Sequence, residues 1–395
     1  MKKKYHYPLV KNNILKKDLD KVIIYLKKKD PVLTQSKFTK KFEQNWSKWL
    51  GTKYSVFVNS GSSANLISIS LLKLKYPEGG DVIVPPFTWS SDISSVIHCG
   101  FNPVFVDINL NNLAMNDEEI IKKITKKTKA VFLTYAQGFN GLSSKLLNFL
   151  KEKKIELIED VCESHGATFK KNKLGTFGWT SNFSFYYAHH MSTIEGGMIC
   201  TSCYDTYNNI LMLRSHGMLR EVSDIKFKNK IYKNNNKLNK DFIFNLAGYN
   251  FRNNEIGALI GLNQLKRLDN NIKKRNSNHK FFLDNINNEL FYTKFDLNGS
   301  SNYAFNLILK KKNSNLMKKL IYALNRAKIE FRLGSAGGGN QLRQPYLKNI
   351  VTYKNFEKFK NVEHMHFYSM YIGNYPDLKI KDIKKIVKVI NSIKN

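Results

Sequence analysis

The chain has 395 residues, of which 42% are hydrophobic and 13% aromatic, so it can bury one large core or two modest ones and is not a disordered chain. Its formal net charge is +33, but the lysines are spread over the whole chain rather than gathered in one arm, which argues against nucleic acid as its partner. Four cysteines are too few for a disulfide scaffold, and no apolar run approaches bilayer length. The basic start is followed by KNNILKKDLD rather than by an apolar run, so we expect no signal peptide and a cytoplasmic protein.

The first two thirds of the chain predict an α/β fold. From residue 54 to about 204, short runs rich in Val, Ile and Phe alternate with amphipathic segments, as βαβ units around a mostly parallel sheet do. A helical lead-in over residues 1–50 precedes them. Within this region Asn116 is expected to cap a helix, with Glu119 at its third position.

The remaining third predicts a second, smaller domain. A helix over 205–220, ending in RSHGM, is followed by a Lys/Asn-rich surface loop over 221–240. Helical spacing then runs through GYNFRNNEIGALIGLNQLKRLDNNI, and a strand and two helices follow in NYAFNLILKKK, NSNLMKKLIYALNRAKI and IKDIKKIVKVINSIK. We therefore predict a large cofactor-binding domain over 1–270 and a small α+β domain over 271–395.

Three stretches in the large domain carry candidate chemistry. NSGSSAN, residues 59–65, falls where a strand turns into a helix, and its free backbone N–H groups and hydroxyls could cradle a phosphate. Asp160 ends an apolar strand, at the edge where open α/β sheets place ligands, and could hold a pyridine nitrogen protonated. Taken singly, an ordinary helix start and an ordinary capping acid explain these two features as well. The third stretch is SFYYAHHMSTIEGGM, residues 184–198.

In combination these stretches resemble the nucleotide-sugar aminotransferases, enzymes of the pyridoxal phosphate-dependent fold type I. The resemblance runs from about residue 34 to the end of the chain. It rests on five motifs in the family's order: FEQNWSKWLGTKYSVFVNSGSSAN, PPFTW, EDVCESHGA, the segment from SF to EGG, and GYNFR.

The resemblance implies a set of cofactor contacts for pyridoxal or pyridoxamine 5'-phosphate. Ser62, Ser63 and Ser184 would bind its phosphate, beside Gly61 in the same turn. Trp89 would stack on the ring, Asp160 would pair with the pyridine nitrogen, and Glu163 takes the place of a glutamine beside the ring. Asn250 matches a residue that reaches the neighbouring subunit's phosphate, which implies a homodimer with shared active sites.

One departure from the family concerns its catalytic lysine. That lysine lies six residues before the EGG glutamate, and His189 occupies the position here. A lysine amine can bond to the cofactor aldehyde and later return a proton to the sugar, whereas imidazole can only move protons. His189 is therefore our candidate for a catalytic acid and base, and His190 and His216 compete for that role.

The histidine makes the chain similar to a subgroup that removes a hydroxyl instead of adding an amine, the 3-dehydratases of nucleotide-linked 4-keto-6-deoxy sugars. The HH…EGG segment and RSHGM resemble the GDP-4-keto-6-deoxymannose 3-dehydratases, which take their amine from L-glutamate. The segment AGGGNQLRQPYL is more similar to the CDP-sugar dehydratases, so the nucleotide stays open. An aminotransferase that uses another base is a further alternative.

Other residues have less specific patterns. Arg332 and Arg343 are candidate substrate ligands, since a guanidinium matches phosphate oxygens, although surface arginines are common. His364 and His366 are expected to be structural. Cys200 and Cys203 form a C-x-x-C, which we interpret as buried structural thiols, and we expect no metal or iron–sulfur site.

Overall fold

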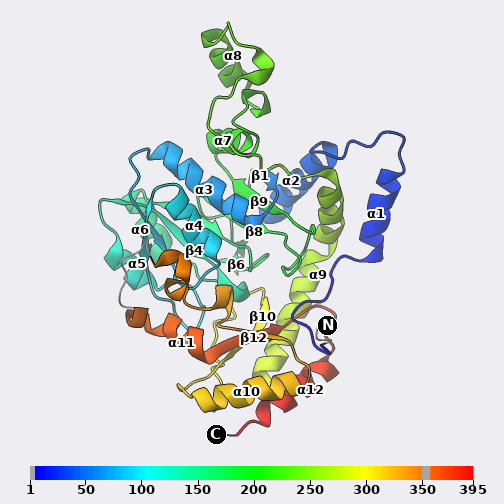
Figure 1. Ribbon diagram of the computed structural model, residues 1–395, viewed down its shortest axis with the longest axis vertical. Helices are drawn as coiled ribbons and strands as arrows, with labels where there is room; N and C mark the ends of the chain where they lie inside the picture. Colours follow the sequence, from blue (N-terminus) through cyan, green and yellow to red (C-terminus); the bar gives the residue numbers. More distant parts are fainter. Residues whose placement is uncertain (1–4, 349–355, 395) are drawn as a thin grey trace.

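The computed structural model describes residues 5–348 and 356–394 and is built around a seven-stranded sheet (Figure 1). Five neighbouring strands are parallel, while the next strand, β9, pairs antiparallel with both of its neighbours. The predicted α/β class with a mostly parallel sheet is therefore confirmed. In spatial order the strands are β1 (Tyr54–Val58), β9 (Gly197–Thr201), β8 (Thr180–Ser184), β5 (Glu156–Asp160), β4 (Thr128–Thr134), β2 (Asp81–Val84) and β3 (Asn102–Phe105).

Helices cover both faces of this sheet because consecutive apolar side chains of its strands point to opposite faces. On β4, Val131 and Leu133 join the apolar cluster on one face, and Ala130 and Phe132 join the cluster on the other. The first face is covered by α2 (Lys37–Leu50), α5 (Asp117–Lys123), α6 (Ser144–Lys153) and α9 (Glu255–Asn285), and the second by α3 (Gly61–Lys75), α4 (Ser90–His98) and α7 (Tyr204–Arg214).

Two helix boundaries can be compared with those predicted from the sequence. The side chain of Asn116 accepts a hydrogen bond from the backbone N–H of Glu119, so the predicted cap of α5 is confirmed. The helix predicted over 205–220 is shorter, because α7 ends at Arg214. His216 and Gly217 take positive φ angles of 60° and 79°, which an α-helix cannot contain.

The prediction of a loop over 221–240 is wrong in part. This stretch contains α8 (Ile225–Asn234), whose first turn is capped by the side chain of Asp224. No residue of α8 is buried, and the helix projects from the rest of the molecule (Figure 1), so the expected surface excursion is confirmed. Among the described residues, no helix is long and apolar enough to cross a membrane.

A second sheet lies at the other end of α9. Its strands, in the order β10 (Ala304–Ile308), β12 (Ser369–Gly373) and β11 (Phe331–Leu333), are antiparallel. The predicted strand and both helices are confirmed in β10, α10 (Ser314–Arg326) and α12 (Ile380–Asn391). The remaining α-helices and strands of the described residues are α1 (Lys16–Leu26), α11 (Lys360–Tyr368) and a ribbon of β6 (Thr168–Phe169) and β7 (Asn172–Lys173).

Helix α9 connects the two halves of the molecule. Leu268 packs in the cluster under the large sheet, whereas Phe282 packs with the small sheet. The division into 1–270 and 271–395 stays a prediction, and it falls inside this helix.

Buried His279 on α9 should make the protein sensitive to acid. Its ring lies between Phe139 and Phe305, and neither ring nitrogen has a hydrogen-bond partner among the described residues. Burial lowers the pKa of His279 to about 3. The imidazole is therefore neutral in the folded chain but binds a proton in the unfolded chain below its ordinary pKa, so folding stability falls as the pH falls from about 6.5 towards 3.

We predict that His279→Leu reduces the loss of unfolding free energy between pH 7 and pH 5 by about 2 kcal/mol. Urea unfolding at the two pH values measures it. An unchanged loss in the variant would contradict the assignment of acid sensitivity to this residue.

Candidate active site

A cavity of about 580 Å³ lies at the carboxyl ends of β5 and β8, where an α/β sheet is expected to bind its ligand. Of the residues predicted from sequence, it brings together Gly61, Ser62, Trp89, Asp160, Glu163, Ser184, His189 and Arg332. Ser63, His216, Asn250 and Arg343 are not among its described lining residues.

The first turn of α3 forms one wall. Ser60 caps the helix by accepting a hydrogen bond from the backbone N–H of Ser63, and its own hydroxyl donates to the Ser63 hydroxyl at 3.0 Å. A Cβ at Gly61 would lie only 2.6 Å from the Cβ of Ser184, so glycine lets the helix start approach the end of β8. The arrangement suits a phosphate, because backbone N–H groups and the Ser62 and Ser184 hydroxyls meet at a helix N-terminus.

Asp160 ends β5 in a network of polar groups. One carboxylate oxygen accepts from the backbone N–H of Cys162 at 2.8 Å, and the other accepts from the amide of Asn65 at 3.1 Å. The same amide also donates to buried Asp92 at 2.7 Å. Burial, and secondly the charge of Asp160, raise the pKa of Asp92 well above its usual range. Asn65 thus links two carboxyl groups, of which Asp160 lines the cavity and can meet a cationic ring nitrogen.

The adjacent histidines of the loop between β8 and β9 differ in their surroundings. His189 lines the cavity, whereas His190 is 1% exposed and its Nε2 bonds to the carbonyl of Ser301 at 3.1 Å. Burial, and secondly the positive charge of Arg275, lower the pKa of His189 to about 4. Its imidazole is therefore neutral at neutral pH and has a nitrogen lone pair that can accept a proton, as a weaker base than a free imidazole. His216 lies outside the cavity lining, with its Nε2 3.5 Å from Nη2 of Arg252.

Glu163 is a second lining residue whose pKa is shifted in this cavity. Its carboxylate accepts hydrogen bonds from the backbone and side-chain N–H groups of Gln137, at 2.8 and 3.2 Å. Burial nevertheless raises the pKa of Glu163 to about 7. A carboxyl group that titrates near neutrality can either accept or donate a hydrogen bond in this cavity.

The two candidate arginines lie in different settings. Arg332, on β11, lines the cavity. Arg343 forms a two-pronged pair with Glu363, at 2.9 and 2.6 Å, so its charge is already matched. His364 bonds to the carbonyl of Leu309 and His366 accepts from the backbone N–H of Asn340, contacts that agree with the structural roles expected for them.

The cysteine prediction is half right. Cys200 is buried on β9, and burial raises the pKa of its thiol to about 12. Cys203, by contrast, is exposed at the N-cap position of α7. No cluster of three or more potential metal ligands occurs within 5–348 and 356–394.

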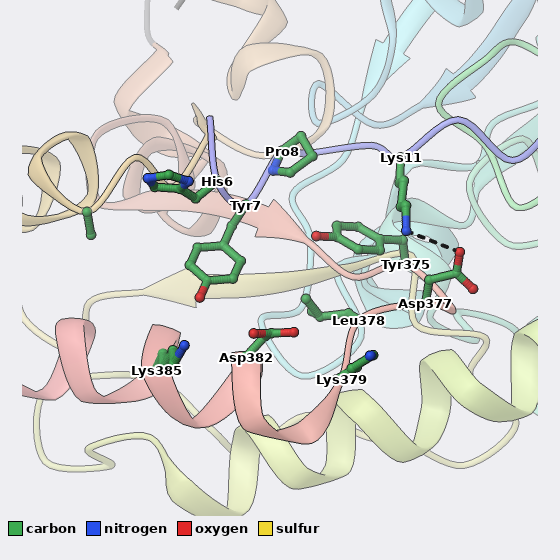
Figure 2. Close-up of a pocket in the computed structure, with 11 residues that line it drawn as sticks. His6, Tyr7, Pro8, Lys11, Tyr375, Asp377, Leu378, Lys379, Asp382 and Lys385 are labelled. Atoms are coloured by element: carbon green, nitrogen blue, oxygen red, sulfur yellow. Dashed lines mark ion pairs between the residues drawn. The ribbon is translucent and has the colours of Figure 1, made fainter. Parts of the chain in front are cut away.

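Several lining residues had no sequence signal. Leu9 and Val10 come from the N-terminal segment, and Tyr303, Glu330 and Tyr371 come from the small-sheet half of the chain. Only the fold brings them to the cavity. A second cavity, of about 780 Å³, lies between the N-terminal segment and α12 (Figure 2), and its described lining contains none of the residues predicted for the site.

Comparisons with known proteins agree with this geometry. The GDP-4-keto-6-deoxy-D-mannose 3-dehydratase of Escherichia coli O55:H7 is 33% identical over 351 residues, which cover 87% of this chain and 89% of that protein. A solved structure of the E. coli GDP-4-keto-6-deoxy-D-mannose-3-dehydratase with bound hydrated PLP superposes with a TM-score of 0.88 at 31% identity, covering 98% of this chain and 99% of that chain.

A second structure of a GDP-4-keto-6-deoxymannose-3-dehydratase, with a trapped PLP-glutamate geminal diamine, has a TM-score of 0.87 at 30% identity and covers 98% of this chain and 100% of that chain. Each of these similarities extends over most or nearly all of the length of both compared chains. The model of the DegT/DnrJ/EryC1/StrS aminotransferase family matches residues 13–391, and the chain belongs to that family.

Proposed function

We propose that this chain is a pyridoxamine phosphate-dependent 3-dehydratase that removes the carbon-3 hydroxyl of a nucleotide-linked 4-keto-6-deoxyhexose. One observation carries the proposal. His189, whose imidazole is neutral at neutral pH, lines the same cavity as Asp160, and no lysine occurs among the described residues of the lining. The cavity thus has a group that moves protons and lacks the amine that would bond to the cofactor.

The residues of the cavity fit the cofactor. The α3 N-terminus, with Ser62 and Ser184, suits its phosphate, Asp160 suits its pyridine nitrogen, and Trp89 can cover the ring. We assign Ser63 to the same phosphate site, through its place in the first turn of α3. Bound there, pyridoxamine phosphate supplies an amine for the sugar's keto group and a ring that accepts electrons.

The chain's own part in the reaction is proton transfer. Neutral His189 accepts a proton, and the imidazolium that results can donate it to the hydroxyl leaving carbon 3. Burial, and secondly the positive charge of Arg275, lower the pKa of His189 and so make the imidazolium a readier proton donor. Asp160 favours the process by keeping a positive charge on the ring nitrogen.

For the substrate we favour GDP-4-keto-6-deoxymannose, with L-glutamate as the amine donor. The relatives named for that sugar nucleotide, and the glutamate adduct in one of them, support this choice. Arg332 is our candidate for a nucleotide or sugar contact, because it lines the cavity and carries a charge suited to diphosphate. His216 and Arg343 stay weaker candidates for the substrate.

We further propose a homodimer with shared active sites. Large apolar side chains at the cavity are exposed in the single chain, including Trp89 at 58% and Tyr186 at 48%. Nearby Ile194 is 53% exposed. Large apolar side chains that are exposed beside a site are typical of a protein contact. Asn250 is exposed and outside the cavity of its own chain, as a residue that serves the neighbouring subunit would be.

The test is the mass of the product. Purified protein with pyridoxal phosphate and L-glutamate is offered GDP-4-keto-6-deoxymannose and, separately, CDP-4-keto-6-deoxyglucose. Loss of one oxygen from the GDP sugar is the expected result. Loss from the CDP sugar alone would correct the nucleotide, and exchange of the keto oxygen for an amine would identify an aminotransferase and overturn the proposal.

A further inference from the structure

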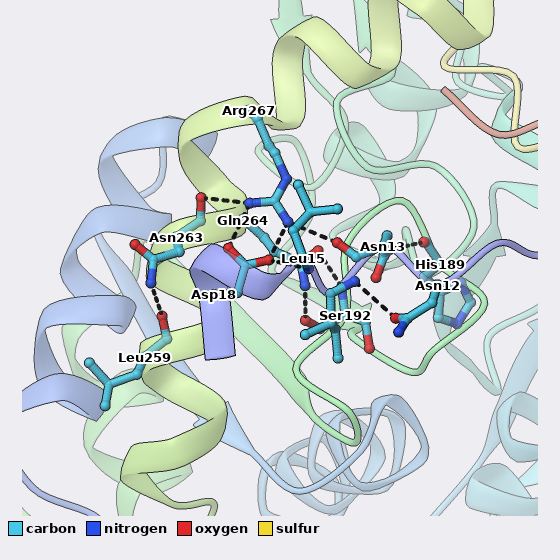
Figure 3. Close-up of polar contacts among 11 residues, drawn as sticks. Asn12, Asn13, Leu15, Asp18, His189, Ser192, Leu259, Asn263, Gln264 and Arg267 are labelled. Atoms are coloured by element: carbon cyan, nitrogen blue, oxygen red, sulfur yellow. Dashed lines mark hydrogen bonds and ion pairs between the residues drawn. The ribbon is translucent and has the colours of Figure 1, made fainter. Parts of the chain in front are cut away.

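The loop that carries His189 and the N-terminal segment of residues 5–15 are both hydrogen-bonded to one turn of α9 (Figure 3). The residues of α9 that make these hydrogen bonds are Gln264 and Arg267, which lie three positions apart and therefore on one face of the helix. Neither residue lines the cavity, so each can act only through what it holds.

Gln264 holds the histidine loop directly. Its side-chain amide donates to the carbonyl of Ser192 at 2.6 Å, and its side-chain oxygen accepts from the backbone N–H of Ser192 at 3.1 Å. Gln264 is 2% exposed and Ser192 is fully buried. Because leaving buried polar groups without partners costs free energy, these two hydrogen bonds fix the backbone three residues after His189.

Arg267 holds the N-terminal segment. Its guanidinium donates to the carbonyl of Asn13 at 2.8 Å and to both carboxylate oxygens of fully buried Asp18, at 2.9 and 2.5 Å. Asp18 in turn accepts from the backbone N–H of Leu15 at 2.9 Å. A two-pronged pair with a buried carboxylate restricts the position of the segment that carries Asn13.

Asn13 then connects the segment to the histidine. Its side-chain amide donates to the carbonyl of His189 at 3.3 Å. The same segment is held at its other end, where Tyr7 pairs with Ile329 and the backbone N–H of Leu9 donates to Glu330 at 2.8 Å. The N-terminal segment thus runs from the small-sheet half of the chain, along the cavity wall, to the backbone of His189.

We infer that Asn13, Gln264 and Arg267 are positioning residues for His189. The inference rests on the proposed function, because the position of His189 affects turnover only if His189 transfers the proton. Turnover requires the imidazole within hydrogen-bond distance of the reacting atoms, and a loop held at His189 and Ser192 keeps it there.

Two variants and two matched controls test the inference. Asn13→Ala removes the bond to His189, and its control is Asn12→Ala, at an exposed neighbour whose side chain accepts from the backbone N–H of Ile14. Gln264→Met keeps the side-chain length without the bonds to Ser192. Its control is Asn263→Leu, because the Asn263 amide donates to the Leu259 carbonyl within α9.

The expected result is a kcat lower by about tenfold or more in both variants, with KM and cofactor absorbance little changed, and controls within about twofold of wild type. Amide hydrogen exchange of residues 186–192, followed by mass spectrometry, should be faster in both variants and unchanged in the controls. A merely structural defect would instead speed exchange throughout the chain and lower the melting temperature.

Unchanged exchange of residues 186–192 in both variants would overturn the inference, and so would faster exchange with an unchanged kcat. The exchange measurement needs no turnover. If the wild-type protein dehydrates no sugar, the proposed function fails, while exchange still reports whether the two residues hold the loop.

Discussion

Replacing His189 with asparagine is expected to lower turnover by about a thousandfold or more, because the only proton-transfer group assigned to the sugar is lost. Asparagine is close to histidine in size and cannot accept a proton at neutral pH. Since none of the proposed cofactor contacts is touched, the absorbance of the bound cofactor should stay as in wild type. Product formation by mass spectrometry and an absorbance spectrum of the same sample measure the two effects.

The matched control is His98→Asn, at the last residue of α4 and outside the cavity lining. It should retain wild-type turnover. Full activity in the His189 variant would show that another group moves the proton, and the mechanism proposed above would be wrong.

The second large effect is expected at Asp160. Asp160→Asn keeps the shape and one acceptor oxygen but removes the negative charge that holds a proton on the pyridine nitrogen, so turnover should fall by about a hundredfold or more. The absorbance of the bound cofactor should shift as well, because the ring loses its partner for the protonated nitrogen. Spectral titration with pyridoxal phosphate and the rate of product formation test this prediction.

The control Asp81→Asn makes the same chemical change at the opposite, amino end of β2, where the carboxylate accepts a hydrogen bond from Asn102. It should leave both spectrum and rate close to wild type. An Asp160 variant with an unshifted spectrum and wild-type rate would remove Asp160 from the cofactor site.

The large sheet could be predicted because its strands follow a simple physical rule. Runs such as DVIV and AVFLT put apolar side chains on both faces, which only a sheet covered by helices can bury. Asp160 was predictable as a candidate site residue for a related reason, since it ends a strand at the edge where ligands bind. Ser184, which ends β8 at the same edge, was proposed only through the family resemblance.

Other features depend on contacts that periodicity does not record. Helix α8 has no fully buried residue, because Phe227, Ile231 and Tyr232 are only partly buried against a small apolar cluster. Few apolar positions therefore stand out in its Lys/Asn-rich sequence, and its cap Asp224 was a further available signal. The placement of Leu9 and Tyr303 in the cavity wall requires segments nearly 300 residues apart to meet. Gln264 resembles any polar residue of an amphipathic helix until its amide is seen bonded to Ser192.

The most direct test of dehydration directed by His189 follows the nitrogen of ¹⁵N-labelled L-glutamate during turnover of GDP-4-keto-6-deoxymannose. If His189 directs the reaction to loss of the carbon-3 hydroxyl, the label appears in ammonia and the sugar product has one oxygen fewer and no nitrogen from glutamate. A sugar that retains the label at carbon 4, with its carbon-3 oxygen in place, would contradict the proposed dehydration and identify transamination.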